Sequence, residues 1–405
     1  MPLLKSDALH HATPHPAKNG DVRPNWAPSD NATPDHAMLG QSILSTGSLK
    51  SQPSESFSQR ILTWYDKNHR LFPWRIPPHD HRKVASPYLT WISEMMLQQT
   101  GASTVVPYFN RFIQAFPTVQ ALAMAPIDGV LVHWQGLGYY RRAHNLHKAA
   151  RIMVDQGIPE SYEEWLALPG IGPYTAAAIT TIGQNQSAVA VDGNIRRVFS
   201  RYFGIDGPDW IKNVWKVAAE QLPQDRWGDY TQGLMDLGAT LCQTRNPMCG
   251  QCPLVQQCHA FASGRPMDWP PKSRKIQKKA LFGHIYVVFD SGHPDNGHVW
   301  MHEAPDEDLL RGLWRFPGSS WDDTLPVHNP SGCLVSAGTI GHLFTHIALT
   351  LHIWICPDAS ILREITFDNS LNGRWIPVAQ IGQFPLSRLM QNVLEIARSN
   401  TSKSP

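Results

Sequence analysis

The chain has 405 residues, of which 42% are hydrophobic and 17% charged, enough for two or three domains with sizeable cores. No run approaches twenty apolar residues, so we expect no transmembrane helix. The N-terminus, MPLLKSDALHH, lacks a basic segment followed by an apolar one, which argues against a secretory signal. The formal net charge is only +2, so any nucleic-acid binding must come from local patches and not from total charge.

The first two segments differ sharply in composition. Residues 1–55 are rich in Pro, Ser, His, Asn and Asp without periodicity, which predicts a disordered tail. From Ser56 to residue 262, helical patterns follow one another between prolines and glycines, which predicts an all-α domain of about 200 residues without strands. The patterns cover residues 57–68, 86–100, 106–116, 128–138, 141–154, 161–168, 175–183, 195–204, 211–222 and 230–242.

The last third of the chain has a different periodicity. Residues 263–280 are interrupted by prolines and carry six Lys or Arg against one Asp, which predicts an interdomain linker with a basic face. Beyond it, β-branched and aromatic runs at 284–290, 298–304 and 350–356 predict strands, and residues 385–399 predict a closing helix. Residues 281–400 therefore form a small α+β domain, and the whole chain is multi-domain.

A cysteine quartet lies within 17 residues near the end of the helical segment. Such a compact group in a long polar sequence is typical of a metal or cluster site in a reducing compartment. The spacing Cys-x6-Cys-x2-Cys-x5-Cys offers one short knuckle where a zinc ribbon has two, so it favours an iron–sulfur cluster but leaves zinc open. Four thiolate ligands would leave the metal or cluster no open coordination position, so we expect it to have a structural role and not a catalytic one. The four are Cys242, Cys249, Cys252 and Cys258.

The segment LPGIGPYTAAAI, residues 168–179, predicts a turn between two helices. Gly170 and Gly172 allow backbone conformations that other residues avoid, and they leave the amides of Ile171 and Gly172 bare beside a helix N-terminus, where an anion can bind. A dinucleotide-binding loop would need a third glycine in the pattern Gly-x-Gly-x-x-Gly, and a P-loop would need Gly-Lys-Ser/Thr. Neither is present, so both kinds of nucleotide-binding loop are excluded. The pattern favours a helix–hairpin–helix grip on a DNA strand over a plain helix–helix turn.

Two carboxylates are candidates for acid and base chemistry. Glu94 lies in a helix expected to begin at Ser86-Pro87, between apolar residues one turn away on either side, where a carboxyl group tends to keep its proton. The alternative is a glutamate that points outward. Asp192, in VDGN, precedes a helix, so capping is its alternative role. One protonated and one ionised carboxyl group are what cleavage through an oxocarbenium-like state requires.

The ordered set of motifs resembles one family closely. PWR (73–75), SEMMLQQT (93–100), GLGYYRRAHNL (136–146), LPGIGPYTA, VDGN and the cysteine loop are similar to adenine DNA glycosylases of the MutY type. That family belongs to the helix–hairpin–helix glycosylase superfamily, which also contains endonuclease III. The resemblance is dense over residues 56–262 and continues through GLWRFPG (312–318) and LFTH (343–346). It implies excision of adenine opposite 8-oxoguanine, or guanine, from double-stranded DNA after base flipping.

The resemblance also implies roles for the catalytic candidates. Glu94 would be the general acid that protonates adenine, and Asp192 would stabilise the oxocarbenium ion, with Asn194 nearby. Tyr174 falls where the endonuclease III branch has its Schiff-base lysine, and in the adenine branch the tyrosine orders the active site. The enzyme would therefore be monofunctional, removing the base without cutting the strand. The cysteine loop would hold a [4Fe–4S] cluster.

Further residues are implied to contact DNA or the lesion. Gln99 and Tyr139 fall at positions that wedge into the base stack around 8-oxoguanine, and Arg75 falls near the catalytic pocket. The hairpin with Gly170 and Gly172 would hold a phosphate. Phe344, Thr345 and His346 match the family's Phe-Ser-His loop, which recognises 8-oxoguanine, and threonine keeps the hydroxyl group of serine.

The C-terminal domain resembles the Nudix fold but departs from its catalytic pattern. No glutamate-rich helix with Arg-Glu-x-x-Glu-Glu can be drawn after Gly318, so we expect a lesion reader without pyrophosphatase activity. Arg196 stands where some adenine glycosylases carry a lysine that traps the abasic product. Because a guanidinium stays protonated, we expect little or no trapping by borohydride.

Two other functions remain as alternatives. An endonuclease III-like glycosylase and lyase acting on oxidised pyrimidines would need a lysine at Tyr174, and a non-enzymatic iron–sulfur protein that binds damaged DNA would not need both Glu94 and Asp192. We expect a monomer, without membrane association, in the bacterial cytoplasm at the nucleoid.

Overall fold

The computed structural model describes residues 55–78, 80, 86–272, 277–290, 297–305, 308–327, 334–356, 362 and 373–401. The tail predicted for residues 1–55 lies outside these residues except for Glu55, and so do residues 273–276 of the predicted linker. Within the described residues, no helix has both the length and the apolar character needed to cross a bilayer.

The chain from Phe57 to Ala262 is helical, as predicted. Two short α-helices, α4 (Val119–Met124) and α12 (His259–Ala262), were missed because six and four residues are too few for an apolar period to show. The same holds for the single-turn 3-10 helices η2 (Cys249–Gln251) and η3 (Val255–Gln257). The elements are α1 (Phe57–Asn68), α2 (Pro87–Leu97), α3 (Ala102–Ala115), α4 (Val119–Met124), α5 (Ile127–Trp134), α6 (Arg141–Gln156), α7 (Tyr162–Leu166), α8 (Pro173–Ala178), the π-helix η1 (Ile179–Gly183), α9 (Gly193–Phe203), α10 (Trp210–Glu220), α11 (Trp227–Thr240) and α12 (His259–Ala262).

Helix α2 begins where the sequence predicts. The Ser86 side chain accepts a hydrogen bond from the amide of Leu89, and Pro87 occupies the first helical position, where its missing N–H is no loss. Eight of the eleven residues of α2 are buried. A helix that is covered on nearly all sides buries its polar residues too, and Glu94 is one of them.

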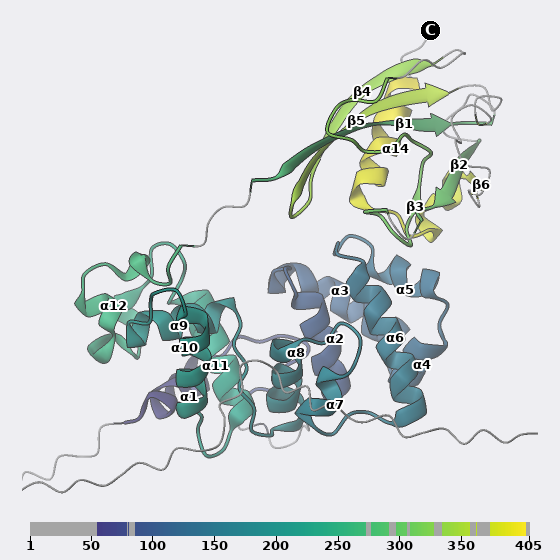
Figure 1. Cartoon of the computed structure of the whole chain (residues 1–405). Helices are drawn as coiled ribbons and strands as arrows, with labels where there is room; N and C mark the ends of the chain where they lie inside the picture. Colours follow the sequence, from purple (N-terminus) through teal and green to yellow (C-terminus); the bar gives the residue numbers. More distant parts are fainter. Residues whose placement is uncertain are drawn as a thin grey trace, which may run out of the picture. The chain divides into compact units, whose positions relative to one another are not determined.

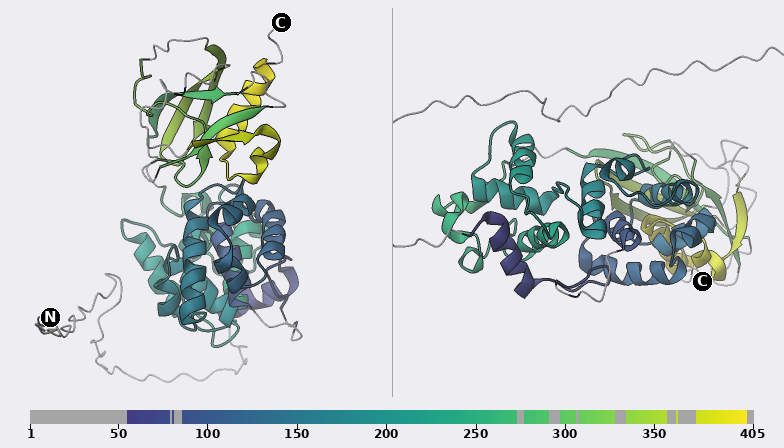
Figure 2. Two further views of the ribbon diagram at one scale, coloured as in Figure 1. Left: turned by 90° about the vertical axis from the view of Figure 1, so that its right-hand side faces the viewer. Right: turned by 90° about the horizontal axis from the view of Figure 1, so that it is seen from below.

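These helices form two lobes, which Figures 1 and 2 show. Helices α2–α8 pack among themselves as the first lobe, and α1 packs with α9–α12 as the second lobe. The π-helix η1 contacts both α2 and α11 and so joins the lobes. Glu94 therefore belongs to the first lobe, whereas Asp192, just before α9, belongs to the second.

The C-terminal part contains two three-stranded sheets, with strand orders β1-β5-β4 and β3-β2-β6. Strand β1 is parallel to β5, and the other pairs are antiparallel. Helix α14 packs on β4 and β5, as the yellow helix beside the strands in Figure 2 shows. The elements are β1 (Lys279–Val288), β2 (His298–Glu303), β3 (Trp314–Arg315), β4 (Val335–Leu343), β5 (Ile347–Cys356), β6 (Gly373–Pro377), η6 (Val378–Gln383) and α14 (Arg388–Thr401).

The three predicted strands are confirmed as β1, β2 and β5, but three more strands were missed. Strand β3 has only two residues. Strand β4 has no buried residue, and a bulge between Ser336 and Gly338 breaks its register, so it shows no apolar alternation. The α+β fold class holds, with more sheet than the sequence predicted.

Candidate active site

Glu94 projects from α2 and is only 5% exposed. Its Oε2 accepts a hydrogen bond of 2.8 Å from the hydroxyl group of Tyr174. Burial raises the pKa of Glu94 to about 7, and the charge of Asp192 adds to the rise, whereas the Tyr174 hydrogen bond and Arg75 lower it. A carboxyl group with this pKa is partly protonated near neutral pH and can donate a proton to a leaving group.

The glycine-rich turn places the helix that carries the hydrogen-bond donor to Glu94. Gly170 has φ +78°, and a Cβ there would lie 2.7 Å from the Cβ of Asn145, so only glycine fits. Gly172 precedes α8 with extended backbone that any residue adopts. The prediction that the amide of Ile171 is bare is wrong, because this amide donates to the carbonyl of Leu168 at 3.2 Å.

Asp192 both caps α9 and faces the site. Its Oδ1 accepts a 2.6 Å hydrogen bond from the amide of Ile195, and its Oδ2 accepts a 3.0 Å bond from Nδ2 of Asn194. Burial raises the pKa of Asp192, and the bonds from Ile195 and Asn194 lower it. The net shift of this pKa is upward, and the two donors oppose it because they favour the carboxylate anion.

Arg197 connects Asn194, the partner of this carboxylate, to the cysteine loop, and no local motif in the sequence indicated that role. Its Nη2 donates to Oδ1 of Asn194 at 2.8 Å and to the carbonyl of Gly238 at 2.7 Å. Its Nε donates to the carbonyl of Cys242 at 2.7 Å. The orientation of Asn194 beside Asp192 therefore depends on where the cysteine loop lies.

Asp236 is a second functional candidate that sequence reasoning missed. It lies on α11 with no exposure, and both of its oxygens accept 2.9 Å hydrogen bonds from Nη1 of Arg75. Arg70 donates to the same carboxylate through its amide at 2.9 Å and its Nε at 2.8 Å. Asp236 thus holds Arg75 where its charge reaches Glu94.

Gln99 and Tyr139 lie in two separate loops but share an unusual backbone. Gln99 has φ +60° and Tyr139 has φ +49°, in the left-handed region that residues with a Cβ rarely adopt. Both side chains are exposed, Tyr139 by 51%. A strained backbone that presents exposed side chains is typical of a binding surface. We name these loops, residues 98–100 and 135–140, the wedge loops.

Phe344, Thr345 and His346 form the tight connection between β4 and β5. The amide of Phe344 donates to the carbonyl of Ile347 at 2.8 Å, which closes the turn. Thr345 and His346 are exposed, and the Thr345 hydroxyl lies 3.3 Å from the hydroxyl of Tyr139. The structure therefore brings one predicted lesion-reading residue against one predicted wedge residue.

The four cysteines are brought together in the loop after α11. The thiols of Cys249, Cys252 and Cys258 each interact electrostatically with that of Cys242. Arg201 donates to Sγ of Cys242 at 3.4 Å and to the carbonyl of Gln243 at 2.7 Å. Among the described residues, no three His, Cys, Asp or Glu side chains are arranged to hold a single metal ion. The donor set fits a cubane cluster, in which each of four irons takes one thiolate.

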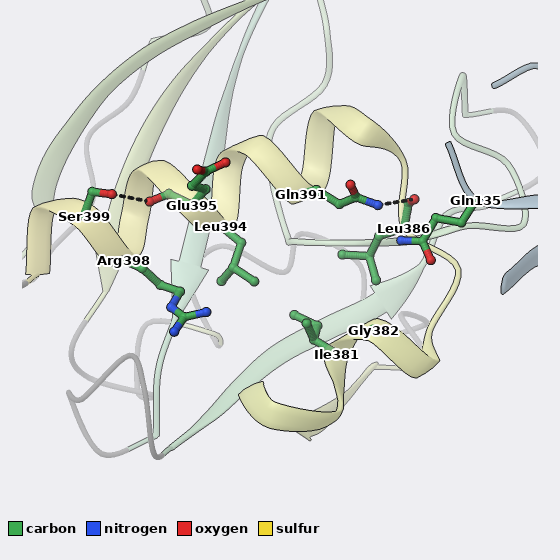
Figure 3. A pocket seen from close by; sticks show the side chains of 9 residues that line it. All are labelled: Gln135, Ile381, Gly382, Leu386, Gln391, Leu394, Glu395, Arg398 and Ser399. Atoms are coloured by element: carbon green, nitrogen blue, oxygen red, sulfur yellow. Dashed lines mark hydrogen bonds between the residues drawn. The ribbon is translucent and has the colours of Figure 1, made fainter. Parts of the chain in front are cut away.

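A pocket of about 500 Å³ lies elsewhere, along η6 and α14 (Figure 3). Ile381 and Leu394 point toward one another across it, and Gln135 lies at its rim. None of the residues around Glu94 lines it. This pocket is therefore separate from the candidate active site, whose groups lie where the two lobes meet.

Two family models match the chain. The HhH-GPD superfamily of base excision DNA repair proteins matches residues 92–221, and the NUDIX domain matches residues 292–396. These matches confirm the helix–hairpin–helix and Nudix-like parts that the motifs predicted.

Curated relatives cover most of the chain. An adenine DNA glycosylase of Buchnera aphidicola (strain Bp) is 41% identical over 79% of this chain and 90% of the relative. Another from Buchnera aphidicola (strain Sg) is 32% identical over 84% of this chain and 98% of the relative. The adenine DNA glycosylase of Arabidopsis thaliana is 35% identical over 67% of this chain, which spans only 49% of that longer relative. Two relatives are matched over nearly their whole length, so the chain belongs to the family of adenine DNA glycosylases, which are DNA N-glycosylases that act in base excision repair.

Proposed function

We propose that the enzyme is a monofunctional glycosylase that removes adenine paired with 8-oxoguanine, or with guanine, from double-stranded DNA. The observation that carries the proposal is a pair of carboxyl groups: Glu94 is buried and bonded to Tyr174, and Asp192 is partly buried and bonded to Asn194. We expect the protein to act as a monomer in the bacterial cytoplasm.

The two carboxyl groups divide the chemistry of hydrolysis. Glu94 gives its proton to a ring nitrogen of adenine as the bond between that base and C1′ of the sugar breaks, and adenine leaves neutral. Asp192, as an anion, stabilises the positive charge on C1′ and the ring oxygen. Water then adds to C1′ and loses a proton, and an abasic site remains.

The absence of a lyase step follows from the residues near the reacting carbon. Tyr174 offers a phenol, and burial together with the charge of Glu94 keeps its pKa well above the ordinary value, so it stays protonated. A phenol cannot form the Schiff base that cuts the strand, and neither can the guanidinium of Arg196. The strand should therefore stay intact after base removal.

A duplex with adenine opposite 8-oxoguanine tests the proposal. We expect strand cleavage only after hot alkali and no complex trapped by borohydride. A parallel duplex with an oxidised pyrimidine should not be cut in either condition. Cleavage of either duplex without alkali would contradict monofunctional chemistry, and no alkali-dependent cleavage of the first duplex would contradict the proposed substrate.

We assign recognition of the lesion to side chains of the wedge loops and of the connection between β4 and β5. Gln99 and Tyr139, on their left-handed backbone, would enter the base stack, and Phe344, Thr345 and His346 would contact 8-oxoguanine. The hydroxyl pair of Tyr139 and Thr345, 3.3 Å apart, supports a shared role at the lesion.

The four cysteine thiols would hold a [4Fe–4S] cluster, whose contribution is structural because its irons carry no open position. Arg201 would hold the Cys242 end of the loop in place through its hydrogen bond to Sγ of Cys242. Arg197 bonds both to the carbonyl of Cys242 and to Oδ1 of Asn194, so the position of the loop would set the orientation of Asn194. Purified protein should show a broad visible absorption band and about four irons per chain. Cys252→Ser should lose both and lower the melting temperature. A colourless protein containing zinc would contradict the cluster.

A further inference from the structure

Arg142, the second residue of α6, is a buried cation that donates to five main-chain carbonyls and to one side-chain hydroxyl. It is 6% exposed, and among the described residues no carboxylate pairs with it. Burying an arginine without an ion pair is unfavourable unless its N–H groups are well used. Its charge also lies over the rings of Trp134 and Tyr139, with the guanidinium carbon 5.3 and 5.4 Å from their centroids.

One nitrogen of Arg142 holds the end of α2. Nη1 donates to the carbonyls of Met95 at 3.0 Å, Met96 at 2.8 Å and Gln98 at 2.5 Å. The last carbonyls of a helix have no partner within the helix, and a cation there also meets the negative end of the helix dipole. Arg142 therefore fixes where α2 ends and the first wedge loop begins.

The other nitrogen of Arg142 holds the second wedge loop. Nη2 donates to the carbonyls of Leu137 and Gly138, both at 3.1 Å, and reaches the hydroxyl of Thr100 at 3.4 Å. One planar guanidinium thus binds both wedge loops at once, which a lysine ammonium with its different geometry cannot reproduce.

Two of the carbonyls that Arg142 binds belong to the peptide groups that precede Gln99 and Tyr139, and the orientation of these groups determines φ of both residues. The oxygen of Gln98 lies on the peptide plane joined to Gln99, and the oxygen of Gly138 lies on the plane joined to Tyr139. The angle φ of a residue is the rotation of that preceding plane about its own N–Cα bond. Fixing both planes therefore fixes both left-handed conformations.

We propose that Arg142 is a positioning residue that holds Gln99 and Tyr139 ready to enter the base stack, so that the flipped adenine is extruded before any chemistry occurs. The proposal rests on the wedge roles given under the proposed function. Arg142 acts through the loops and does not touch the reacting atoms, so its loss should affect base extrusion and leave proton donation by Glu94 unchanged.

The test compares the full-length wild type with Arg142→Lys, and with Arg151→Lys as a control at an exposed arginine of the same helix. Single-turnover excision is measured on a paired duplex and on a duplex whose adenine lies in an unpaired bubble. On the paired duplex, Arg142→Lys should be between about tenfold and about 100-fold slower, the range that a small misplacement produces. On the bubble it should approach the wild-type rate, because extrusion is no longer needed.

Two further measurements separate positioning from folding. With 2-aminopurine opposite 8-oxoguanine, and Glu94→Gln to stop excision, Arg142→Lys should lose most of the fluorescence rise that reports unstacking. In a Gln99→Ala/Tyr139→Ala background, Arg142→Lys should have little further effect, because contacts that act through the same groups are not additive. The proposal would be overturned if Arg142→Lys lowered the excision rate equally on the paired and bubble duplexes, and equally in the wild-type and Gln99→Ala/Tyr139→Ala backgrounds. It would also be overturned if the rate of Arg142→Lys on the paired duplex lay within twofold of the wild-type rate.

Should Arg142→Lys not fold, Gln99→Pro gives the same test. Proline fixes φ at about −65° and so forbids the left-handed conformation while Arg142 remains. Gln99→Pro should be slower than Gln99→Ala on the paired duplex and be rescued by the bubble, and equal rates for these two variants would overturn the proposal. Failure of the proposed function is distinct, since the wild type itself would then excise no adenine from either duplex.

Discussion

Replacing Glu94 with glutamine is expected to lower the rate of adenine excision by about 10²–10⁴-fold, the range that general acids contribute. Glutamine keeps the size of the side chain and still accepts the hydrogen bond from Tyr174, but it has no proton to give to the leaving base. Binding to a duplex with adenine opposite 8-oxoguanine should stay within a few-fold of wild type. Single-turnover excision and gel-shift titration measure the two effects.

The pH dependence provides an internal check on this variant. Because burial raises the pKa of Glu94 to about 7, the proton-donating form is present below that pH and is lost as the pH rises through it. The wild-type rate should fall above about pH 7, and the residual rate of Glu94→Gln should not follow that fall. Glu220→Gln, at an exposed position on α10, is the matched control. Full activity of Glu94→Gln, or loss of its binding, would contradict the assigned role.

Replacing Asp192 with asparagine is the second change with a large expected effect, about 10²–10³-fold in the excision rate. The variant removes the negative charge that stabilises the cationic sugar. Asparagine is as good a helix cap as aspartate, so α9 should still begin at Gly193 and the melting temperature should change little.

The control for this change is Asp209→Asn, at the exposed residue that precedes α10 and makes no side-chain cap bond. It should leave the rate unchanged. If Asp192→Asn lowers the rate only in proportion to a loss of folded protein, Asp192 acts as a cap and not in catalysis. Circular dichroism beside the excision assay distinguishes the two.

The sequence predicted the long, capped elements and missed what depends on tertiary contacts. The start of α2 at Ser86-Pro87 was predictable because capping is local. The direction of Glu94 was not, since α2 is covered on nearly all sides and an apolar stripe cannot be distinguished within it. Strand β4 was missed because its pairing with β5, and not its own residues, makes it a strand.

The same limit applies to the site. Glu94, Tyr174 and Asp192 were identified from motifs, yet Asp236 looked like an ordinary aspartate on a helix. Its partner Arg75 lies 161 positions away, so no local pattern joins them. The left-handed backbone of Gln99 was equally hidden, because glutamine is a residue that rarely adopts it and the cause is a guanidinium on another helix.

The burial of Glu94 also links the folding of the enzyme to proton uptake. In the unfolded chain this carboxyl group ionises near its ordinary pKa of 4.5, whereas in the folded chain it holds its proton up to about pH 7. Between these two values folding takes up a proton, so the free energy of unfolding falls as the pH rises, by about 3 kcal/mol in all at roughly 1.4 kcal/mol per pKa unit. The contribution of this carboxyl group to stability is therefore lost above about pH 7, where the group is also inactive as an acid.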